Sequence, residues 1–196
     1  MTDKADINKL IEYHKWKFTG KVFFPLLPLP QNNGPQRTPV LMSRVEYGFH
    51  GYFNKNKITP FETFQVGGDG MTGYTSNYAV DVIGLRGYDN GGLAGQNALV
   101  NYGHAYTRMS MEVRYPFILD PSSTIYGLAF IEAGNAWGSI NEFNPFDLKR
   151  SAGVGVRIFL PMVGMMGIDW AYGFDKPFGG IKQGGSNFHF ILGQEF

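Results

Sequence analysis

Apolar and polar residues alternate along most of this chain, in segments separated by Gly, Pro, Asn and Asp. In the segment Met165–Phe174, Ile168, Trp170 and Tyr172 share one parity, and Asp169 has the other. Because a strand directs successive side chains to opposite faces, such a segment has one apolar face and one polar face. The pattern therefore predicts an all-β protein.

Eight strands are expected after a lead-in over residues 1–12, which the sequence predicts to be a short helix. The expected strands are His14–Phe24, Leu41–Phe53, Phe61–Val66, His104–Tyr115, Thr124–Gly134, Arg150–Leu160, Met165–Phe174 and Phe188–Phe196. Most are near the ~9–11 residues that a tilted strand needs to cross a membrane. Charges keep to one parity, and the other parity is almost purely apolar. We therefore expect an antiparallel transmembrane β-barrel, because the inner face of a soluble sandwich would favour Val, Ile and Leu over aromatic residues.

The parity also predicts which side chains face lipid and which face the barrel lumen. The residues expected to face lipid are Trp16, Phe49, Met111, Ile168, Trp170, Tyr172, Phe188 and Phe190. The residues expected to point inward are Arg44, Glu46, Arg108, Arg157 and Asp169. A charge on the lipid face costs ~2–4 kcal/mol at mid-bilayer, which gives the alternation a physical basis.

The final segment carries its aromatic parity to the last residue. One face holds Phe188, Phe190, Leu192 and Phe196, and the other holds His189, Gly193 and Glu195. Outer-membrane barrels have aromatic girdles at both membrane interfaces, so we expect this end at such a boundary. Replacing Phe196 by Asp is then expected to impair membrane insertion far more than the same change at Glu195.

The alternation of apolar and polar residues is interrupted over residues 67–103, which are rich in Gly, Asn, Asp and Tyr. Loops beyond ~15 residues are uncommon in compact domains and are usually functional or disordered. Near the middle stands Leu85-Arg86-Gly87-Tyr88, in a loop with little apolar content of its own to anchor it. On these residues alone, Arg86 is most simply a solvated turn residue.

Composition narrows the classes of function. The net charge is +1, from 17 basic and 16 acidic residues, which gives no electrostatic footprint for nucleic acid and no polybasic membrane anchor. The chain has no Cys, so disulfides and thiol-based metal or redox sites are excluded. Aromatic residues make up 16% of the chain, and 27 of its 196 residues are Gly, a mix that favours strands and tight turns.

Neither a transmembrane helix nor a signal peptide is expected. The most apolar stretch, Phe159 to Ile168, is interrupted by Pro and Gly and falls short of the ~20 residues that a spanning helix needs. The N-terminal residues lack a basic region followed by an apolar one. Because an outer-membrane protein needs such a signal, the barrel interpretation makes this chain the C-terminal part of a longer protein.

No arrangement for catalysis, cofactor binding or metal binding is evident. Gly153 and Gly155 lie within an expected strand at period two, where small inward residues relieve crowding, so a phosphate-binding loop is not expected. The four His residues lie on different strands without metal-ligand spacing and are expected at solvated lumen positions. No Ser lies in a nucleophile elbow and no carboxylate pair is placed for acid–base work, so an enzyme is not expected.

Several motifs follow one another in a recognisable order. They are Phe64-Gln-Val-Gly-Gly68, Leu85-Arg86-Gly87-Tyr88, Met111-Glu-Val-Arg-Tyr-Pro116, Phe130-Ile-Glu-Ala-Gly-Asn-Ala-Trp137, Arg150-Ser-Ala-Gly-Val-Gly-Val-Arg157, Gly167-Ile-Asp-Trp-Ala-Tyr-Gly173 and Phe188-His-Phe-Ile-Leu-Gly-Gln-Glu-Phe196. In this order they resemble the BamA family of outer-membrane assembly factors, in the bacterial surface antigen superfamily. The resemblance covers residues 12–196.

The resemblance implies a site and a fold. The family barrel has sixteen strands preceded by periplasmic POTRA domains, so this chain would supply its C-terminal half. Residues 67–103 would fold into the lumen, where Arg86 would pair with Glu112 and Glu132. Both acids lie on the polar parity of the strands that follow the loop, and a guanidinium has five donors in a fixed fork. The terminal strand of the lateral gate would comprise Phe188, Phe190, Leu192, Gly193 and Phe196.

The implied function is the assembly and insertion of β-barrel proteins into the bacterial outer membrane, by strand templating at the barrel seam and without a cofactor. The implied partners are outer-membrane lipids, nascent outer-membrane β-barrel proteins and accessory assembly lipoproteins, and no nucleic acid. Two departures from the family pattern stand out: Glu132 replaces the more usual Asp, and the POTRA domains and the first strand are missing.

Three other functions stay open on the sequence. A related two-partner-type barrel would translocate proteins through its lumen, and the number of POTRA domains upstream would identify it. A small structural or adhesive outer-membrane barrel would close on itself, with Phe188–Phe196 paired to His14–Phe24. A soluble ligand-binding sandwich would remain monodisperse without detergent.

Overall fold

The fold is known from a computed structural model that describes most of the chain. The described residues are 12–27, 37–53, 61–71, 80–93, 103–120, 122–162, 164–175 and 184–193. The helical lead-in expected over residues 1–12 and the terminal Phe196 lie outside the described residues, apart from Glu12.

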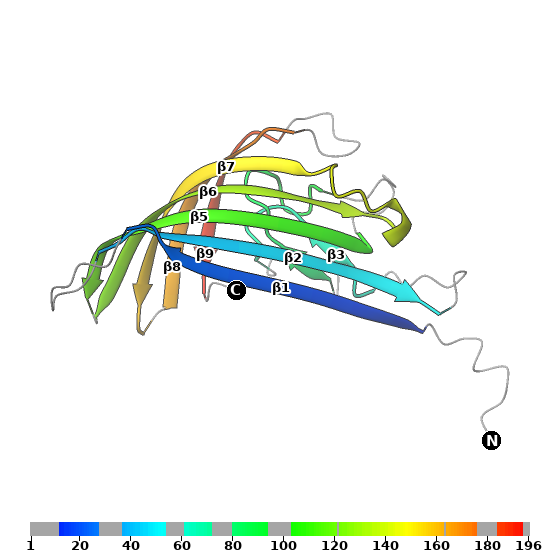
Figure 1. Ribbon diagram of the computed structural model, residues 1–196, viewed down its shortest axis with the longest axis horizontal. Helices are drawn as coiled ribbons and strands as arrows, with labels where there is room; N and C mark the ends of the chain where they lie inside the picture. The colour runs from blue at the N-terminus through cyan, green and yellow to red at the C-terminus, as the bar shows by residue number, and fades with distance from the viewer. Residues whose placement is uncertain are drawn as a thin grey trace, which may run out of the picture.

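Seven long strands form one curved antiparallel sheet (Figure 1). Its strands are β1 (Tyr13–Pro25), β2 (Val40–Tyr52), β5 (Ala105–Asp120), β6 (Ser123–Trp137), β7 (Lys149–Leu160), β8 (Gly164–Gly173) and β9 (Ser186–Leu192). They lie in the order β1-β2-β5-β6-β7-β8-β9, and every neighbouring pair is antiparallel. Strands that follow one another in the sheet are therefore joined by simple up-and-down connections.

The sequence prediction is wrong at Phe61–Val66, which was expected to be one of eight strands of the barrel wall. Only Phe64–Val66 is extended there (β3), and it pairs in parallel with β4 (Asp81–Ile83) in a separate two-stranded sheet. This small sheet lies on the concave side of the arch, where Phe64 and Val66 are fully buried. A short apolar alternation has the same appearance whether it faces lipid or the packed interior of a loop, so periodicity did not separate the two.

The segment between β2 and β5 has an apolar core of its own, contrary to the sequence expectation. This core joins loop residues to two inward residues of the large sheet; its members are Phe64, Val66, Ile83, Leu85, Tyr88, Leu93, Tyr106 and Ala136. Single bridges also tie Phe64 to Gly103, Val66 to Leu93 and Gly68 to Leu85. Burying a large apolar side chain contributes ~1.5–3 kcal/mol, so this cluster is a substantial anchor for the loop.

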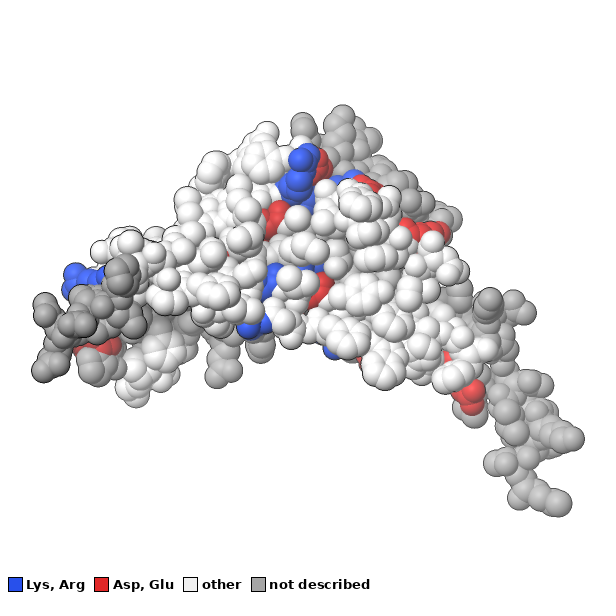
Figure 2. Space-filling model, in the orientation of Figure 1, with Lys and Arg blue, Asp and Glu red and all other residues white. Residues whose placement is uncertain are grey.

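The predicted facing of the long strands is confirmed. Trp170 is 40% exposed on the convex face, whereas its neighbour Asp169 is 0% exposed on the concave face. The outward side chains of β1, β8 and β9 follow the same rule, with Trp16, Ile168 and Phe188 all exposed. Figure 2 shows that uncharged residues dominate this outward face, with charged atoms in small groups. An apolar surface of this extent is typical of a face that meets lipid or a partner.

The arch is open at both edges. In the part of the chain that the structure describes, β1 pairs only with β2, and β9 pairs only with β8. The pairing of the last strand with the first, which a small closed barrel would require, is thus not observed. The two edges differ in length, because β1 has 13 residues and β9 has 7.

The connections lie at two rims of the sheet. At one rim the β5–β6 and β7–β8 connections are short, whereas the β1–β2 connection spans residues 26–39. The β2–β5, β6–β7 and β8–β9 connections are longer and lie at the other rim, where the β6–β7 connection contains the 3₁₀ turn η2 (Ile140–Glu142). Within the described residues, no helix is long and apolar enough to cross a membrane.

Candidate functional site: an arginine held by three strands

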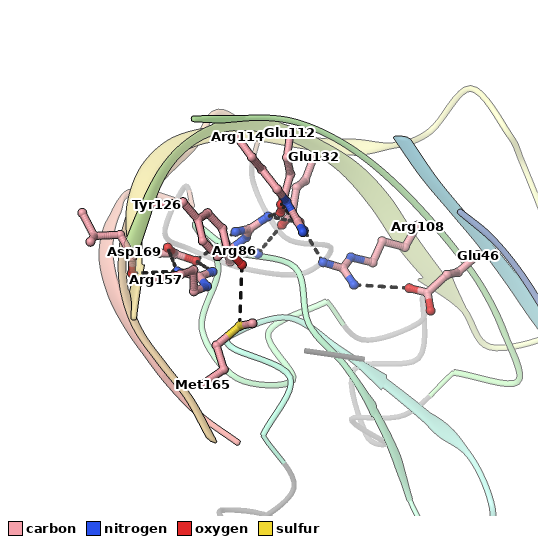
Figure 3. Close-up of polar contacts among 11 residues, drawn as sticks. Glu46, Arg86, Arg108, Glu112, Arg114, Tyr126, Glu132, Arg157, Met165 and Asp169 are labelled. Atoms are coloured by element: carbon pink, nitrogen blue, oxygen red, sulfur yellow. Dashed lines mark hydrogen bonds and ion pairs between the residues drawn. The ribbon is translucent and has the colours of Figure 1, made fainter. Parts of the chain in front are cut away.

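Arg86 lies at a turn of the loop on the concave side of the sheet and is only 5% exposed (Figure 3). Its Nη2 donates to Glu132 Oε1 at 2.8 Å and also to Glu112, and its Nη1 donates to Asp169 Oδ2 at 2.9 Å. The backbone N–H of Arg86 donates to Glu132 Oε2 at 2.8 Å. The guanidinium carbon also lies 3.4 Å from the ring centroid of Phe130, in cation–π range. One loop residue thus contacts three strands of the wall.

Strand register explains why these carboxylates converge. Glu132 on β6 is paired with Ser110 on β5, so Glu112 lies two residues further along the same inward face. Asp169 comes from β8, which is two strands away from β6 in the sheet. Curvature of the sheet turns all three inward faces toward the loop (Figure 3).

Arg86 belongs to a larger ionic network on the concave face. Arg108 forms ion pairs with Glu132 at 2.7 Å and with Glu46 at 3.3 Å. Arg114 donates to Glu112 at 2.7 Å. Further along the wall, Arg157 Nη2 donates to Asp169 Oδ2 at 2.7 Å. Each carboxylate that holds Arg86 is therefore also bonded to an arginine of the wall. This matters because leaving one buried charge without its partner costs ~3–5 kcal/mol.

Glycine makes room for these charged side chains against the wall. A Cβ at Gly155 would overlap the Asp169 carboxylate, and a Cβ at Gly167 would lie 2.6 Å from Arg157 Cδ. Gly153 and Gly155 are the small residues that the sequence placed inward. The structure shows that the space they leave is filled by Phe130 and by Asp169.

The other residues of the loop signature fix the loop in different ways. Leu85 is fully buried in the apolar core, and Gly87 has φ +90°, which favours glycine. A Cβ at Gly87 would lie 2.8 Å from the backbone nitrogen of Gly173, so the loop touches the wall directly. The Tyr88 hydroxyl donates to the carbonyl of Arg150 at 2.6 Å, and burial raises the pKa of Tyr88 to about 12.

The loop also contacts the first strand of the sheet. Asp81 on β4 forms ion pairs with Lys15 and Lys17 of β1, each at 3.0 Å. Lys15 also pairs with Glu62 at 2.9 Å. These two acids and two lysines lie at the β1 edge, on the opposite side of the sheet from β9. The loop is thus linked to the β1 edge of the arch as well as to β8.

The structure brings Arg86 together with Glu112 and Glu132, the two acids that the sequence proposed. Sequence reasoning missed Asp169 as the third partner, although parity had already placed it inward. Parity assigns a face to each strand, but it does not tell which inward residues of non-adjacent strands meet. The signal available in the sequence was an inward Asp on one expected strand together with an inward glycine, Gly155, on the preceding one, which leaves room for its carboxylate.

The terminal strand starts and ends earlier than expected. The outward residues Phe188, Phe190 and Leu192 are exposed, as the sequence placed them. Gly193 has φ +107° directly after β9, and its N–H donates to the carbonyl of Met165 at 2.9 Å. Phe196, the last of the predicted gate residues, lies outside the described residues.

The histidines do not occupy the solvated lumen positions that were expected. His50 and His189 are buried at 2% and 6% exposure, and His14 lies on the outward face with Trp16. His50 packs 5.7 Å from His104, centroid to centroid. In the described ranges, no three His, Asp or Glu side chains are grouped to hold a metal ion.

An apolar convex face, an ionic concave face and a loop inserted between them are the features of a β-barrel wall. Residues 6–196 match the Omp85 superfamily domain, and the chain therefore belongs to the Omp85 superfamily. Members of this superfamily are outer-membrane proteins, and they include barrels that insert proteins into the outer membrane and barrels that translocate proteins across it. No curated protein matches the chain.

Proposed function

We propose that this chain is the C-terminal half of a BamA-like assembly factor that inserts β-barrel proteins into the bacterial outer membrane. The complete barrel would have sixteen strands and be preceded by POTRA domains. The order of motifs along the chain, membership of the Omp85 superfamily and the seven-stranded antiparallel wall support this proposal. Outer-membrane barrels have short periplasmic turns and longer extracellular loops, so the rim with the short β5–β6 and β7–β8 connections would face the periplasm.

The proposal rests on the edge of β9, which would lie beside the first strand at the seam of a complete sixteen-stranded barrel. Among the described residues its backbone pairs on one side only, with β8. An edge strand is a template for pairing with another chain, and an unsatisfied backbone in lipid costs several kcal/mol per group. A nascent strand that pairs with β9 would satisfy the unpaired backbone groups of β9 and its own backbone groups at the same time. The drive for templated insertion is thus supplied by the bilayer and requires no cofactor or covalent step.

The network around Arg86 would hold the loop in the lumen while the edge exchanges partners. Three strands of the wall contact one guanidinium, so the loop would act as a fixed internal support. The proposed partners are outer-membrane lipids at the convex face, nascent β-barrel proteins at the β9 edge and accessory assembly lipoproteins.

A depletion experiment with the full-length protein tests this function. Depletion is expected to lower the outer-membrane levels of many unrelated β-barrel proteins, and the native gene is expected to restore them. Loss of one secreted protein, with normal levels of other barrels, would instead place the chain in the translocation branch. Unchanged levels of both would contradict an assembly or translocation role.

A further inference from the structure

His189 connects the terminal strand to the loop. Its side chain points inward from β9 and is 6% exposed, between the outward residues Phe188 and Phe190. Its Nε2 accepts a hydrogen bond from the backbone N–H of Gly87 at 3.0 Å. Across the ranges that the structure describes, this is the only hydrogen bond between β9 and the loop.

The surroundings of Gly87 hold this N–H donor in place. Gly87 is pressed against the wall on its other side, where an added Cβ would lie 3.0 Å from Ser151 Cβ and 2.8 Å from the Gly173 nitrogen. Its neighbour Arg86 is fixed by three carboxylates. The loop therefore presents a fixed N–H donor to β9, which is the shortest of the seven strands and one of the two edge strands.

We propose that His189 is a positioning residue that docks the terminal strand on the loop, and that protonation of its imidazole releases this contact. A neutral imidazole has one nitrogen without a proton, which can accept a hydrogen bond, whereas an imidazolium carries N–H on both nitrogens. The Gly87 N–H would then face a second N–H. The contact is present when His189 is neutral and is lost as the pH falls through the pKa of its imidazole. The consequence for strand exchange rests on the proposed function.

Charged groups of three other elements face the imidazole. They are Asp69 and Arg86 of the loop, Glu132 of β6 and Asp169 of β8. Glu132 and Asp169 are each bonded to two arginines, and Asp69 accepts a bond from the N–H of Met71 at 2.9 Å. These acids thus keep their own partners, and the Gly87 N–H is the group that protonation of His189 leaves unpaired.

The test measures loop mobility in the full-length protein reconstituted in lipid. A spin label on Asp89→Cys, at an exposed loop position, reports the loop at about pH 7.5 and about pH 4, the lower value lying well below the ordinary imidazole pKa of ~6.5. The native residue is expected to show a mobile component that rises roughly fivefold to tenfold on acidification, the effect of one lost hydrogen bond. His189→Gln retains an acceptor oxygen and does not titrate, so its spectrum should stay immobile at both values.

Two further variants complete the design. His189→Leu has no acceptor and should be mobile at both pH values. His104→Gln removes another partly buried imidazole, which bonds Tyr52 instead of the loop, and should keep the native pH response. If His189→Leu fails to fold, the comparison of His189→Gln with the native residue still decides whether protonation of His189 releases the loop.

An equal pH response in His189→Gln and the native protein would overturn the proposal. So would a native-like, immobile spectrum in a folded His189→Leu protein. Label mobility reports the docking of the loop and not the assembly of substrates. The measurement therefore stays informative if the chain proves to belong to the translocation branch.

Discussion

Replacing Arg86 by Lys tests whether the forked guanidinium anchors the loop. Lys is a point charge that cannot bridge Glu112, Glu132 and Asp169 from two separate nitrogens. If the ammonium keeps one carboxylate, two charge-assisted hydrogen bonds are lost, at ~1.5–3 kcal/mol each. Because every one of the three acids retains an arginine of the wall, the loss should lie at the low end, ~3 kcal/mol. A change of this size raises the detached fraction of the loop ~100-fold.

Hydrogen exchange in the full-length, lipid-reconstituted protein measures this effect directly. Exchange at the backbone amides of Arg86 and Gly87, which donate to Glu132 and His189, should rise by about that factor. Arg150→Lys is the matched control, because the Arg150 side chain is 68% exposed and pairs with Asp175 outside the network. Exchange in Arg86→Lys that stays within about twofold of the native protein would refute the reasoning and leave the apolar core as the anchor.

A reciprocal exchange of Arg86 and Glu132 would be a poor test of the same contact. An acid at position 86 would face Glu112 and Asp169, and an arginine at position 132 would face Arg108. The swap creates new like-charge contacts, so its failure to restore function would not disprove the pairing.

Two other predictions concern the rim and the lipid face. Arg150 lowers the pKa of Asp175 through a hydrogen bond and ion pair, so this contact stabilises the rim above the carboxyl's unfolded pKa and is lost as the pH falls through its folded pKa. Protection of the Arg150 amide, which donates to Asp175 at 2.7 Å, should then fall in acid when exchange is taken relative to the intrinsic rate at each pH, and Asp175→Asn should abolish that fall. Ile168→Arg should cost ~2–4 kcal/mol in unfolding experiments from lipid, whereas Phe146→Arg in the β6–β7 connection should cost almost nothing.

The sequence predicted the parts of the structure that depend on alternation alone. Trp170 and Asp169 face opposite sides because successive strand residues must do so, and lipid tolerates only one of them. The same rule failed at Phe61–Val66, because a buried loop core selects apolar residues as lipid does. It also left the contacts of Asp169 and His189 unassigned. Those contacts depend on sheet curvature and on the path of the loop, which no periodicity encodes.

The central claim is that the edge of β9, at the seam of the complete barrel, receives strands of other proteins. A photo-crosslinking phenylalanine analogue at Phe190 would place a reactive group on β9, and the same analogue at Val154 on β7 would place one equally outward in the middle of the wall. In cells in which assembly of a β-barrel substrate is stalled, position 190 is predicted to crosslink that substrate and position 154 is not. Equal crosslinking from both positions, or crosslinking from position 154 alone, would contradict the claim.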